Sequence, residues 1–265
     1  TPCYQYFKAI PDSANKMYHG IQLHKEKGIL TTSLDAIENQ FRKNTGAAVM
    51  LWCNPQNPGG TVYDENFVAG LSALCHEHDV LLVSDEIWSD LIRTEMPHSP
   101  LGKYAQPNHL TITLMAATKT FNIAAFPCAI AIIPNTTLRK TYQQTITAMP
   151  QITPLSYRVT EACLRHGWSW RRSLLAALKN NLCQIQEWHS SQNQLSLITG
   201  DASFLAWFTD ISGRTDLDLR LAAKGLRVSS GSLFGDSTSV RLNFGCSPDT
   251  LAEALKLMKK TINNE

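Results

Sequence analysis

Polar side chains stand at the ends of three predicted buried strands in the first half of the chain. The amide-rich loop NPQNPGG follows the first strand, Asp85 lies near the end of the second, and Lys119 directly follows the third. Because the carboxyl ends of neighbouring parallel strands meet at one edge of a sheet, we expect an amide, a carboxylate and an amine to converge there. An ionised side chain at the end of a buried strand is costly unless it is paired or used, so the pattern predicts a ligand site. The three strands are expected at residues 47–53, 80–87 and 110–118.

Lys119 has two interpretations. Taken alone, the segment TLMAATKTFN favours a lysine at a strand end whose ammonium group reaches water. Taken together with Asp85 and the NPQNP loop at neighbouring strand ends, Lys119 is better explained as a nucleophile at the mouth of a site.

Several other reaction chemistries have no matching motif. The sequence contains no GxGxxG for a dinucleotide, no GxxxxGK[ST] for a nucleoside phosphate and no GxSxG for a serine hydrolase. His76 and His78 are two residues apart, so on a helix they face different directions, and we expect no metal site there.

Composition limits the class of protein. The 265 residues carry a net charge of +2 with acids and bases interspersed, which argues against a nucleic-acid partner. No apolar run approaches the roughly 20 residues of a membrane span, and the N-terminal stretch TPCYQYFKAI lacks the build of a signal peptide. The seven cysteines are odd in number and include no CxxC, so we expect free thiols in a reducing, cytoplasmic protein.

The order of the predicted elements indicates two domains. In residues 1–150, strands that are apolar on both faces, including one at 128–135, accompany amphipathic helices such as 64–79, which Asp64 can cap. This order predicts an α/β domain with a mostly parallel sheet and helices on both faces. In residues 151–265, helical segments precede short alternating strands, which predicts a smaller α+β C-terminal domain.

Five segments in register carry a family resemblance: TPCY, NPQNPGG, SDEIWSDL, ATKTFNIA and SVRLNFG. In this order and spacing they resemble the fold-type I pyridoxal-phosphate (PLP) enzymes. They are most similar to the cystathionine β-lyase / C–S lyase branch of the class I/II aminotransferase family, which reads TP-x-Y, NPxNPxG, SDEIH-x-DL, SKTFN and VRLNFG. The resemblance spans essentially the whole chain and implies that the first domain is the PLP transferase large domain.

The resemblance implies roles for residues around the cofactor. Lys119 would form an imine with the PLP aldehyde and later move the substrate α-proton. Asp85 would pair with the pyridinium nitrogen, and Asn57 would hydrogen-bond the phenolic oxygen. Tyr4 would stack on the ring, and Thr118 would help to hold the phosphate.

The resemblance also implies a substrate residue and a changed cofactor position. Arg241 would bind the substrate α-carboxylate with its two-pronged guanidinium, which lysine does poorly. Trp88 stands at a cofactor-binding position where the branch usually has His and related aminotransferases have Tyr. Structural interpretations stay open for Asp85 as a helix cap, for Arg241 in an ion pair and for Tyr4 in the core.

The chain departs from the family pattern in two respects. Ala117 replaces the usual proline before Thr-Lys, and Ala125 and Phe126 replace the usual Gly-Leu after it, which changes the pocket lining. Family members also carry an N-terminal portion before TP-x-Y, with a loop that binds the PLP phosphate and residues that cross a dimer interface. We expect that portion to lie elsewhere in a longer chain, to lie on another chain, or to be lost.

The resemblance implies a PLP-dependent carbon–sulfur β-lyase. Its substrate would be a cysteine S-conjugate such as cystathionine, and its products a thiol, pyruvate and ammonia. An aminotransferase would use the same residues, and a non-catalytic relative with a binding or regulatory role is a third alternative. The expected partners are a small amino-acid substrate and a second copy of the chain in a homodimer, with no nucleic acid and no membrane.

Overall fold

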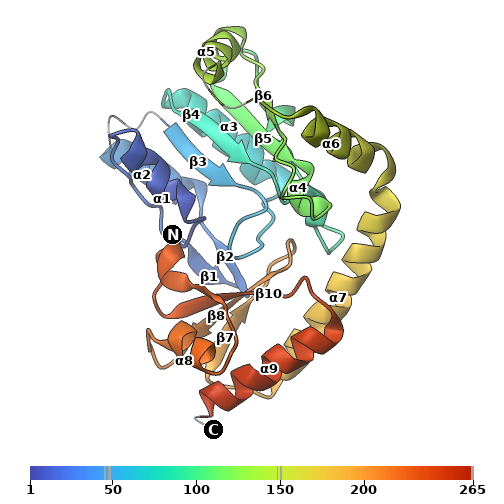
Figure 1. Ribbon diagram of the computed structural model, residues 1–265. Coiled ribbons are helices and arrows are strands. Elements are labelled where there is room, and N and C mark those ends of the chain that lie inside the picture. The colour runs from blue at the N-terminus through green and yellow to red at the C-terminus, as the bar shows by residue number, and fades with distance from the viewer. Residues whose placement is uncertain (45, 47–48, 148, 150, 264–265) are drawn as a thin grey trace. The chain divides into compact units, whose positions relative to one another are not determined.

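The chain forms two compact units, each with its own sheet (Figure 1). The computed structural model describes residues 1–265 except 45, 47–48, 148, 150 and 264–265. Unit 1 consists of Thr1–Thr32, Gln56–Thr61 and Leu174–Glu265, and unit 2 consists of Ser33–Pro55 and Val62–Ser173. No helix in the described part of the chain is long and apolar enough to cross a membrane.

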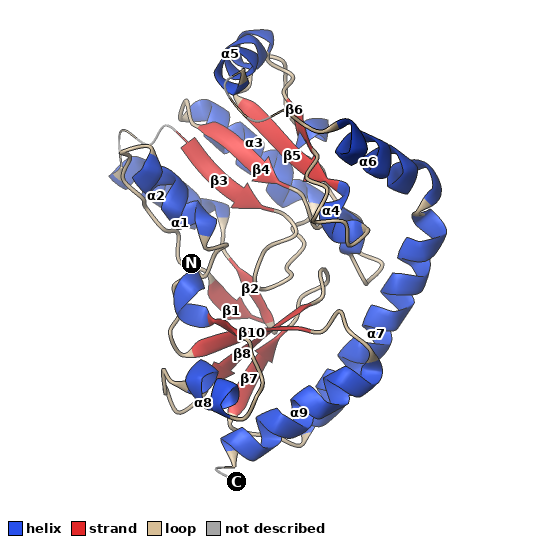
Figure 2. Ribbon diagram, viewed as in Figure 1, coloured by secondary structure: helices blue, strands red, loops and turns tan. Residues whose placement is uncertain are grey.

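Unit 2 is built on a four-stranded sheet in the order β3-β4-β5-β6 (Figure 2). The strands are β3 (Val49–Cys53), β4 (Leu81–Asp85), β5 (Thr111–Ala116) and β6 (Ala129–Ile132). β3, β4 and β5 run parallel, and β6 pairs antiparallel with β5, which confirms the mostly parallel sheet. The helices of this unit are α2 (Leu34–Lys43), α3 (Glu65–Glu77), α4 (Ala117–Thr120), α5 (Thr136–Ile146), α6 (Pro154–His166) and the start of α7 (Trp168–Ser190), with the short turns η1 (Ser89–Leu91) and η2 (Leu101–Lys103).

Helix α3 begins and packs as its sequence predicts. Oδ1 of Asp64 accepts a hydrogen bond from the Phe67 N–H at 2.8 Å, which satisfies a free donor of the first turn. Val68, Leu71 and Cys75 recur at helical spacing and are buried. The helix contacts β4 and lies behind the sheet in Figure 1, so its apolar face helps to fix the strand that ends in the predicted site.

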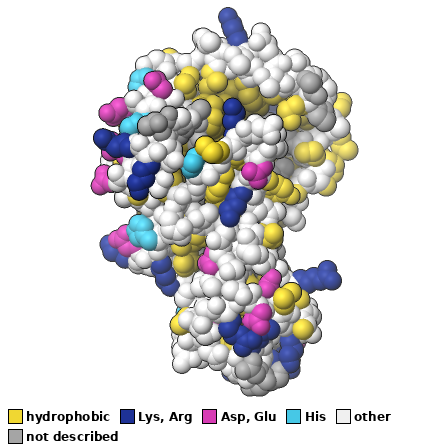
Figure 3. Space-filling model, turned by 90° about the vertical axis from the view of Figure 1, so that its left-hand side faces the viewer, with side chains coloured by type: hydrophobic (Ala, Val, Ile, Leu, Met, Phe, Trp, Pro, Cys, Tyr) yellow, Lys and Arg dark blue, Asp and Glu magenta, His cyan; other side chains and the backbone are white. Residues whose placement is uncertain are grey.

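The fourth strand is less buried than its sequence predicts. β6 forms within 128–135, but the side chains of Ile130 and Ile132 are 46% and 42% exposed. β6 is an edge strand with a hydrogen-bonded neighbour on one side only, and the described residues do not cover it fully. Hydrophobic side chains also lie at the surface in the upper part of Figure 3. An exposed apolar edge of this kind can pair with another chain.

Unit 1 combines an antiparallel sheet in the order β7-β8-β10-β9 with the hairpin β1-β2. Its strands are β1 (His24–Glu26), β2 (Ile29–Thr31), β7 (Leu195–Ile198), β8 (Leu205–Asp210), β9 (Ser229–Ser230) and β10 (Ser239–Asn243). Its helices are α1 (Tyr6–Ser13), the remainder of α7, α8 (Leu217–Ala223), η3 (Gly231–Phe234) and α9 (Pro248–Ile262). Leu30, Ile198, Trp207 and Phe234 form its buried core cluster. This antiparallel, helix-flanked arrangement agrees with the expected α+β order.

The contacts divide the chain at other places than residue 150. Residues 151–173 group with unit 2, and residues 1–32 group with unit 1. The cut after Ser173 falls inside α7, where a continuous helix gives no change of composition to mark a boundary. The division into 1–150 and 151–265 stays a prediction.

Candidate functional site

The predicted site residues fall into two groups, one in each unit. Unit 2 holds Asp85, Trp88, Thr118 and Lys119, and unit 1 holds Tyr4, Asn57 and Arg241. Within each group, the hydrogen bonds, burial and neighbouring charges of these residues can be compared with the roles expected from the sequence.

Asp85 is the last residue of β4, where the sequence places it. Its Oδ1 accepts a hydrogen bond from the Ile87 N–H at 3.1 Å, and no described residue donates to Oδ2. Burial raises the pKa of the Asp85 carboxyl; the Ile87 hydrogen bond and the charge of Lys119 oppose this shift, and the charge of Glu86 adds to it. Oδ2 is therefore available to a ligand that brings a cationic donor.

Lys119 lies on a helical turn rather than at the end of a strand. β5 ends at Ala116, and α4 is closed by a 3.0 Å hydrogen bond from the Phe121 N–H to the Ala117 carbonyl. Alanine is a strong helix former, which favours this early turn, so the predicted strand is two residues too long. The Lys119 side chain is half-buried, and its amine makes no hydrogen bond or ion pair with any described residue.

Contacts with Asp90 hold the turn that carries Lys119. Oγ1 of Thr120 donates to Asp90 Oδ2 at 3.3 Å, and Nε of Arg171 donates to the Asp90 carbonyl. These residues were not predicted for the site, because the sequence gives no sign that position 171 returns to a loop 81 residues earlier.

Thr118 and Trp88 complete the unit 2 group. Thr118 is half-buried and directly precedes Lys119, and its carbonyl accepts from the Ile123 N–H at 3.0 Å. Trp88 is 5% exposed, and its bulky indole lies just before η1. The cofactor roles of both residues stay predictions.

Arg241 and Asn57 meet in unit 1, although 184 residues separate them in the sequence. Arg241 on β10 donates from Nη1 to Asn57 Oδ1 at 2.9 Å and from Nη2 to Ser229 Oγ at 3.3 Å. Its guanidinium lies over the Phe234 ring, with Cζ 4.4 Å from the ring centroid. Burial lowers the pKa of Arg241, and no carboxylate among the described residues forms an ion pair with it. A partly buried cation without an acidic partner is suited to bind an anion.

The bond to Arg241 orients the Asn57 amide. Since Oδ1 accepts from the guanidinium, the NH₂ group points elsewhere and can donate to another acceptor. The loop that carries Asn57 turns at Gly60, where φ is +74°. A Cβ at Gly60 would lie 2.5 Å from the Thr199 carbonyl oxygen, so this close approach of two backbone segments requires glycine.

Tyr4 packs among other aromatic rings. Its ring meets Tyr6 and Phe7 edge to face, with centroids 5.3 Å and 5.9 Å away. It lies close enough to Arg241 for a charge on its hydroxyl to affect the guanidinium. Its stacking on a cofactor ring stays a prediction.

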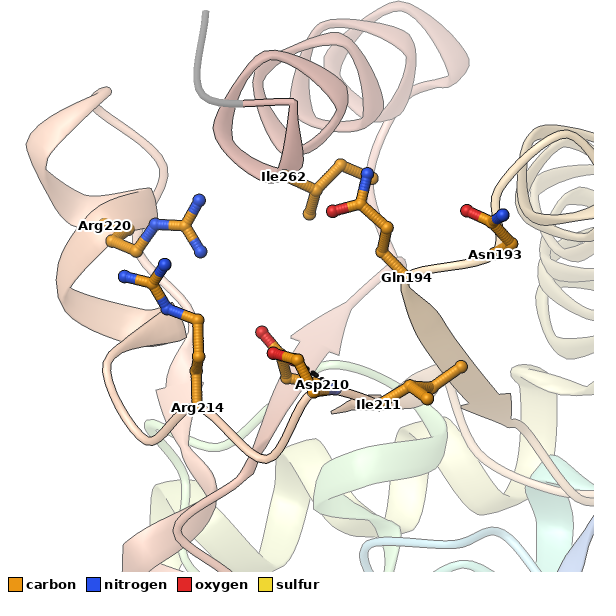
Figure 4. A pocket seen from close by; sticks show the side chains of 8 residues that line it. Asn193, Gln194, Asp210, Ile211, Arg214, Arg220 and Ile262 are labelled. Atoms are coloured by element: carbon orange, nitrogen blue, oxygen red, sulfur yellow. Dashed lines mark hydrogen bonds between the residues drawn. The ribbon is translucent and has the colours of Figure 1, made fainter.

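A separate cavity in unit 1 contains none of the predicted site residues. It measures about 340 Å³ and is lined by Asn193, Gln194, Asp210, Ile211, Ser212, Arg214, Arg220 and Ile262 (Figure 4). Arg214 forms two hydrogen bonds with Asp216, at 3.0 Å and 2.8 Å, and Arg220 donates to the Thr261 carbonyl. Because both guanidiniums have partners within the protein, we assign no ligand to this cavity.

The family of the chain follows from comparison with known proteins. Residues 21–257 match the family model for aminotransferase class I and II. The chain belongs to this family. The family consists of PLP-dependent enzymes, among them cystathionine β-lyases and aminotransferases.

Relatives of known structure or curated sequence are longer than this chain. Cystathionine beta-lyase PatB of Bacillus subtilis (strain 168) is 26% identical over 269 residues, which are 97% of this chain and 69% of PatB. The crystal structure of OvoB matches with a TM-score of 0.94 and 33% identity, over 100% of this chain and 70% of that one. The PLP-bound C–S lyase from Staphylococcus hominis matches with a TM-score of 0.89 and 25% identity, over 99% of this chain and 70% of that one.

The unit 2 residues fit the cofactor of this family. Asp85 is a half-buried carboxylate with a raised pKa, and one of its oxygens has no donor among the described residues, so a pyridinium N–H would stabilise its charged form. An amine that must react with an aldehyde has to be free of competing partners, and Lys119 has none among the described residues. Among all the residues that the structure describes, no group of three or more His, Cys, Asp or Glu side chains could hold a metal ion.

Proposed function

We propose that this chain is a PLP-dependent carbon–sulfur β-lyase that acts on a cysteine S-conjugate such as cystathionine. The observation that carries the proposal is the combination in unit 2 of Lys119, a half-buried amine without a described partner, and Asp85, a half-buried carboxylate with one oxygen left for a ligand. The names of the PatB and S. hominis relatives support the choice of a C–S lyase within the family.

The unit 2 residues hold the cofactor and move the proton. PLP, when bound, supplies an electron sink that stabilises negative charge at the substrate α-carbon. Asp85 would hold the ring nitrogen and keep it protonated through a charge-assisted hydrogen bond. Lys119 takes the α-proton of the substrate with its amine. Thr118 would add a hydroxyl for the phosphate, and Trp88 would form an apolar wall beside the ring.

The unit 1 residues orient the substrate and the ring. Arg241 binds the α-carboxylate, which supplies the negative charge that its guanidinium lacks among the described residues. Asn57 and Ser229 hold the guanidinium in one orientation, so the α-carbon is presented in one geometry. The remaining NH₂ group of Asn57 would donate to the phenolic oxygen of PLP, and Tyr4 would cover the ring face.

Elimination then divides the substrate at the β-carbon. As Lys119 takes the α-proton, the carbon–sulfur bond breaks and its electron pair leaves with the sulfur as a thiolate. Hydrolysis of the remaining three-carbon fragment gives pyruvate and ammonia, so atoms and charge balance without an added oxidant or keto acid.

We infer that the protein is a cytoplasmic homodimer. No disulfide joins the seven cysteines, all of which lie among the described residues, and this suits a reducing compartment. The exposed apolar edge at β6 offers a surface that a second copy can cover. Light scattering of the purified chain should give twice its 29.5 kDa mass, and a mass equal to one chain contradicts the dimer.

Product analysis tests the proposed reaction. The chain is incubated with PLP and cystathionine, and pyruvate and free thiol are measured with and without an added keto acid. Pyruvate and thiol in the absence of a keto acid support the lyase. Turnover that requires a keto acid identifies an aminotransferase, and PLP binding without either product identifies a non-catalytic relative.

A further inference from the structure

A buried carboxylate, Glu86, follows the half-buried Asp85 and has no part in the roles described above. Its side chain is fully buried. Oε1 accepts hydrogen bonds from Ser84 Oγ at 3.0 Å and from the Leu101 N–H at 2.9 Å. Oε2 lies 2.8 Å from Nε2 of His98. The carboxylate is therefore held by three donors from two separate segments of unit 2.

Glu86 and Asp85 lie on opposite sides of one extended segment. The Glu86 N–H donates to the Leu114 carbonyl at 2.9 Å, so the pairing with β5 continues one residue past β4. Successive side chains of an extended segment point to opposite faces, which places Glu86 on the side of Ser84 and away from the free oxygen of Asp85. The two charges are nonetheless adjacent, and the Glu86 charge contributes to the raised pKa of Asp85.

His98 contacts Glu86 and is itself largely buried. Its side chain is 16% exposed, and among the described residues its Nδ1 has no hydrogen-bond partner. The hydrogen bond that the structure gives the ring is the one to Glu86. Among the described residues, the charges found to act on the Asp85 carboxyl are those of Glu86 on its own segment and Lys119 on α4, and its strand neighbours are Cys53 and Leu114.

We propose that His98 and Glu86 form a buried charge pair that sets the protonation state of Asp85. Through Asp85, the pair sets how strongly the ring nitrogen of PLP is bound. An imidazolium at His98 balances the Glu86 carboxylate, so that little negative field reaches Asp85 and the Asp85 carboxyl can ionise. Without His98, the unbalanced Glu86 charge opposes that ionisation. Both are positioning residues that act through Asp85. The consequence for PLP rests on the proposed function, whereas the effect on Asp85 does not.

A purely structural role makes a different prediction. The Glu86 carboxylate also ties His98 and Leu101 to the end of β4, so it anchors the segment between η1 and η2. If anchoring were its whole role, Glu86→Gln and His98→Gln would both lower stability and leave the titration of Asp85 unchanged. A charge pair instead requires that the Asp85 titration shift in opposite directions in the two variants. Glu86→Gln removes the negative charge, whereas His98→Gln removes the positive charge that balances it.

The test follows the Asp85 carboxyl directly by NMR in the full chain without PLP. Aspartate is labelled with ¹³C at the carboxyl carbon, and the Asp85 signal is assigned by its loss in Asp85→Asn. We expect the titration midpoint of Asp85 to rise by about one pH unit in His98→Gln and to fall by a similar amount in Glu86→Gln. His78→Gln is the matched control, since His78 lies 3.7 Å from Glu38 elsewhere in unit 2 and should leave the midpoint unchanged.

Two outcomes overturn the proposal: an Asp85 midpoint unchanged in folded Glu86→Gln, or shifts of the same sign in Glu86→Gln and His98→Gln. If His98→Gln does not fold, the predicted fall in Glu86→Gln still decides. PLP binding is then measured by fluorescence titration, where His98→Gln should bind about tenfold more weakly than the parent at pH values below the parent's Asp85 midpoint and regain affinity as pH rises. A parent chain that takes up no PLP would refute the proposed function alone, because the Asp85 titration is measured without the cofactor.

Discussion

Each unit holds a charged side chain whose partner of opposite charge is missing among the described residues: a carboxylate in unit 2 and a guanidinium in unit 1. In unit 2, Asp85 is a half-buried carboxylate with one oxygen that accepts no hydrogen bond from a described residue. In unit 1, Arg241 is a half-buried guanidinium held by Asn57 and Ser229 but paired with no described carboxylate. Arg214 in unit 1 shows the opposite case, since it is exposed and joined to Asp216 by two hydrogen bonds. A charge that is paired with another residue of the protein has a structural role. Asp85 and Arg241 lack such a partner among the described residues, so Asp85 is suited to bind a cationic group of a ligand and Arg241 an anionic one.

The largest expected effect comes from Lys119→Ala. The substitution removes the amine that reacts with PLP and takes the α-proton, so pyruvate release from cystathionine should fall by at least about 10³-fold. Lys103→Ala is the matched control, because Lys103 is exposed in the same unit and paired with Glu65 at 3.3 Å. Comparable rates for Lys119→Ala and Lys103→Ala would remove Lys119 from the chemistry.

Arg241→Ala should have the next largest effect. Loss of the guanidinium leaves the substrate carboxylate without its partner, and kcat/KM should fall by about 10²-fold or more, mostly through KM. Arg241→Lys should recover only part of this loss, because a lysine cannot hold a carboxylate in a bidentate geometry. Arg214→Ala removes a guanidinium whose charge is already paired and should change kcat/KM by less than about twofold. Equal losses in Arg241→Ala and Arg214→Ala would contradict the comparison.

Asp85→Asn should separate function from stability. Activity should fall by about 10²-fold or more, because an amide cannot balance a pyridinium. In the absence of PLP, however, the variant should be more stable than the parent at neutral pH, since it removes a half-buried carboxylate whose pKa is raised.

The sign of this stability effect depends on pH. The folded parent binds the Asp85 proton more tightly than the unfolded chain does, so the parent loses stability as pH rises through the window above the unfolded-state value of about 3.9. The advantage of Asp85→Asn should therefore vanish as the pH falls toward about 4. Thermal unfolding of both proteins at several pH values between neutral and acidic measures this difference in stability. A variant that is less stable than the parent at neutral pH would contradict the expected sign.

Asp64→Ala should have the smallest effect on activity. Asp64 is an exposed acid whose role is complete within the protein, because it caps α3 through the Phe67 N–H. Its loss should cost about 1 kcal/mol in the free energy of unfolding, measured in urea, and leave kcat/KM unchanged. If Asp64→Ala lost as much activity as Asp85→Asn, the presence of a hydrogen-bond partner within the protein would not separate structural acids from functional ones.

Local patterns predicted the elements that hold the unit 2 residues. Continuous apolar runs located β3, β4 and β5, and the helical spacing after Asp64 located α3. The early end of β5 was missed, because the choice between one more strand residue and a helical turn at Ala117 depends on small differences in propensity. The exposure of β6 was missed because an apolar run does not reveal whether a strand lies at the centre or the edge of a sheet.

Contacts between distant segments were largely beyond sequence reasoning. The motifs pointed to Asn57 and Arg241 separately, but nothing in their spacing indicated that one side chain orients the other across 184 residues. Phe234 beneath Arg241 and His98 beside Glu86 had no motif of their own, since each is defined by the folded geometry. The residues that tune the site were therefore found only in the structure.

The most direct test of the central claim is the chemical identification of the lysine that binds PLP. The purified chain is incubated with PLP, reduced with borohydride, digested and mapped by mass spectrometry. The account predicts a phosphopyridoxyl group on the peptide that contains Lys119 and its absence from the same peptide position in Lys119→Ala. A label confined to other lysines, or a chain that takes up no PLP, would contradict it.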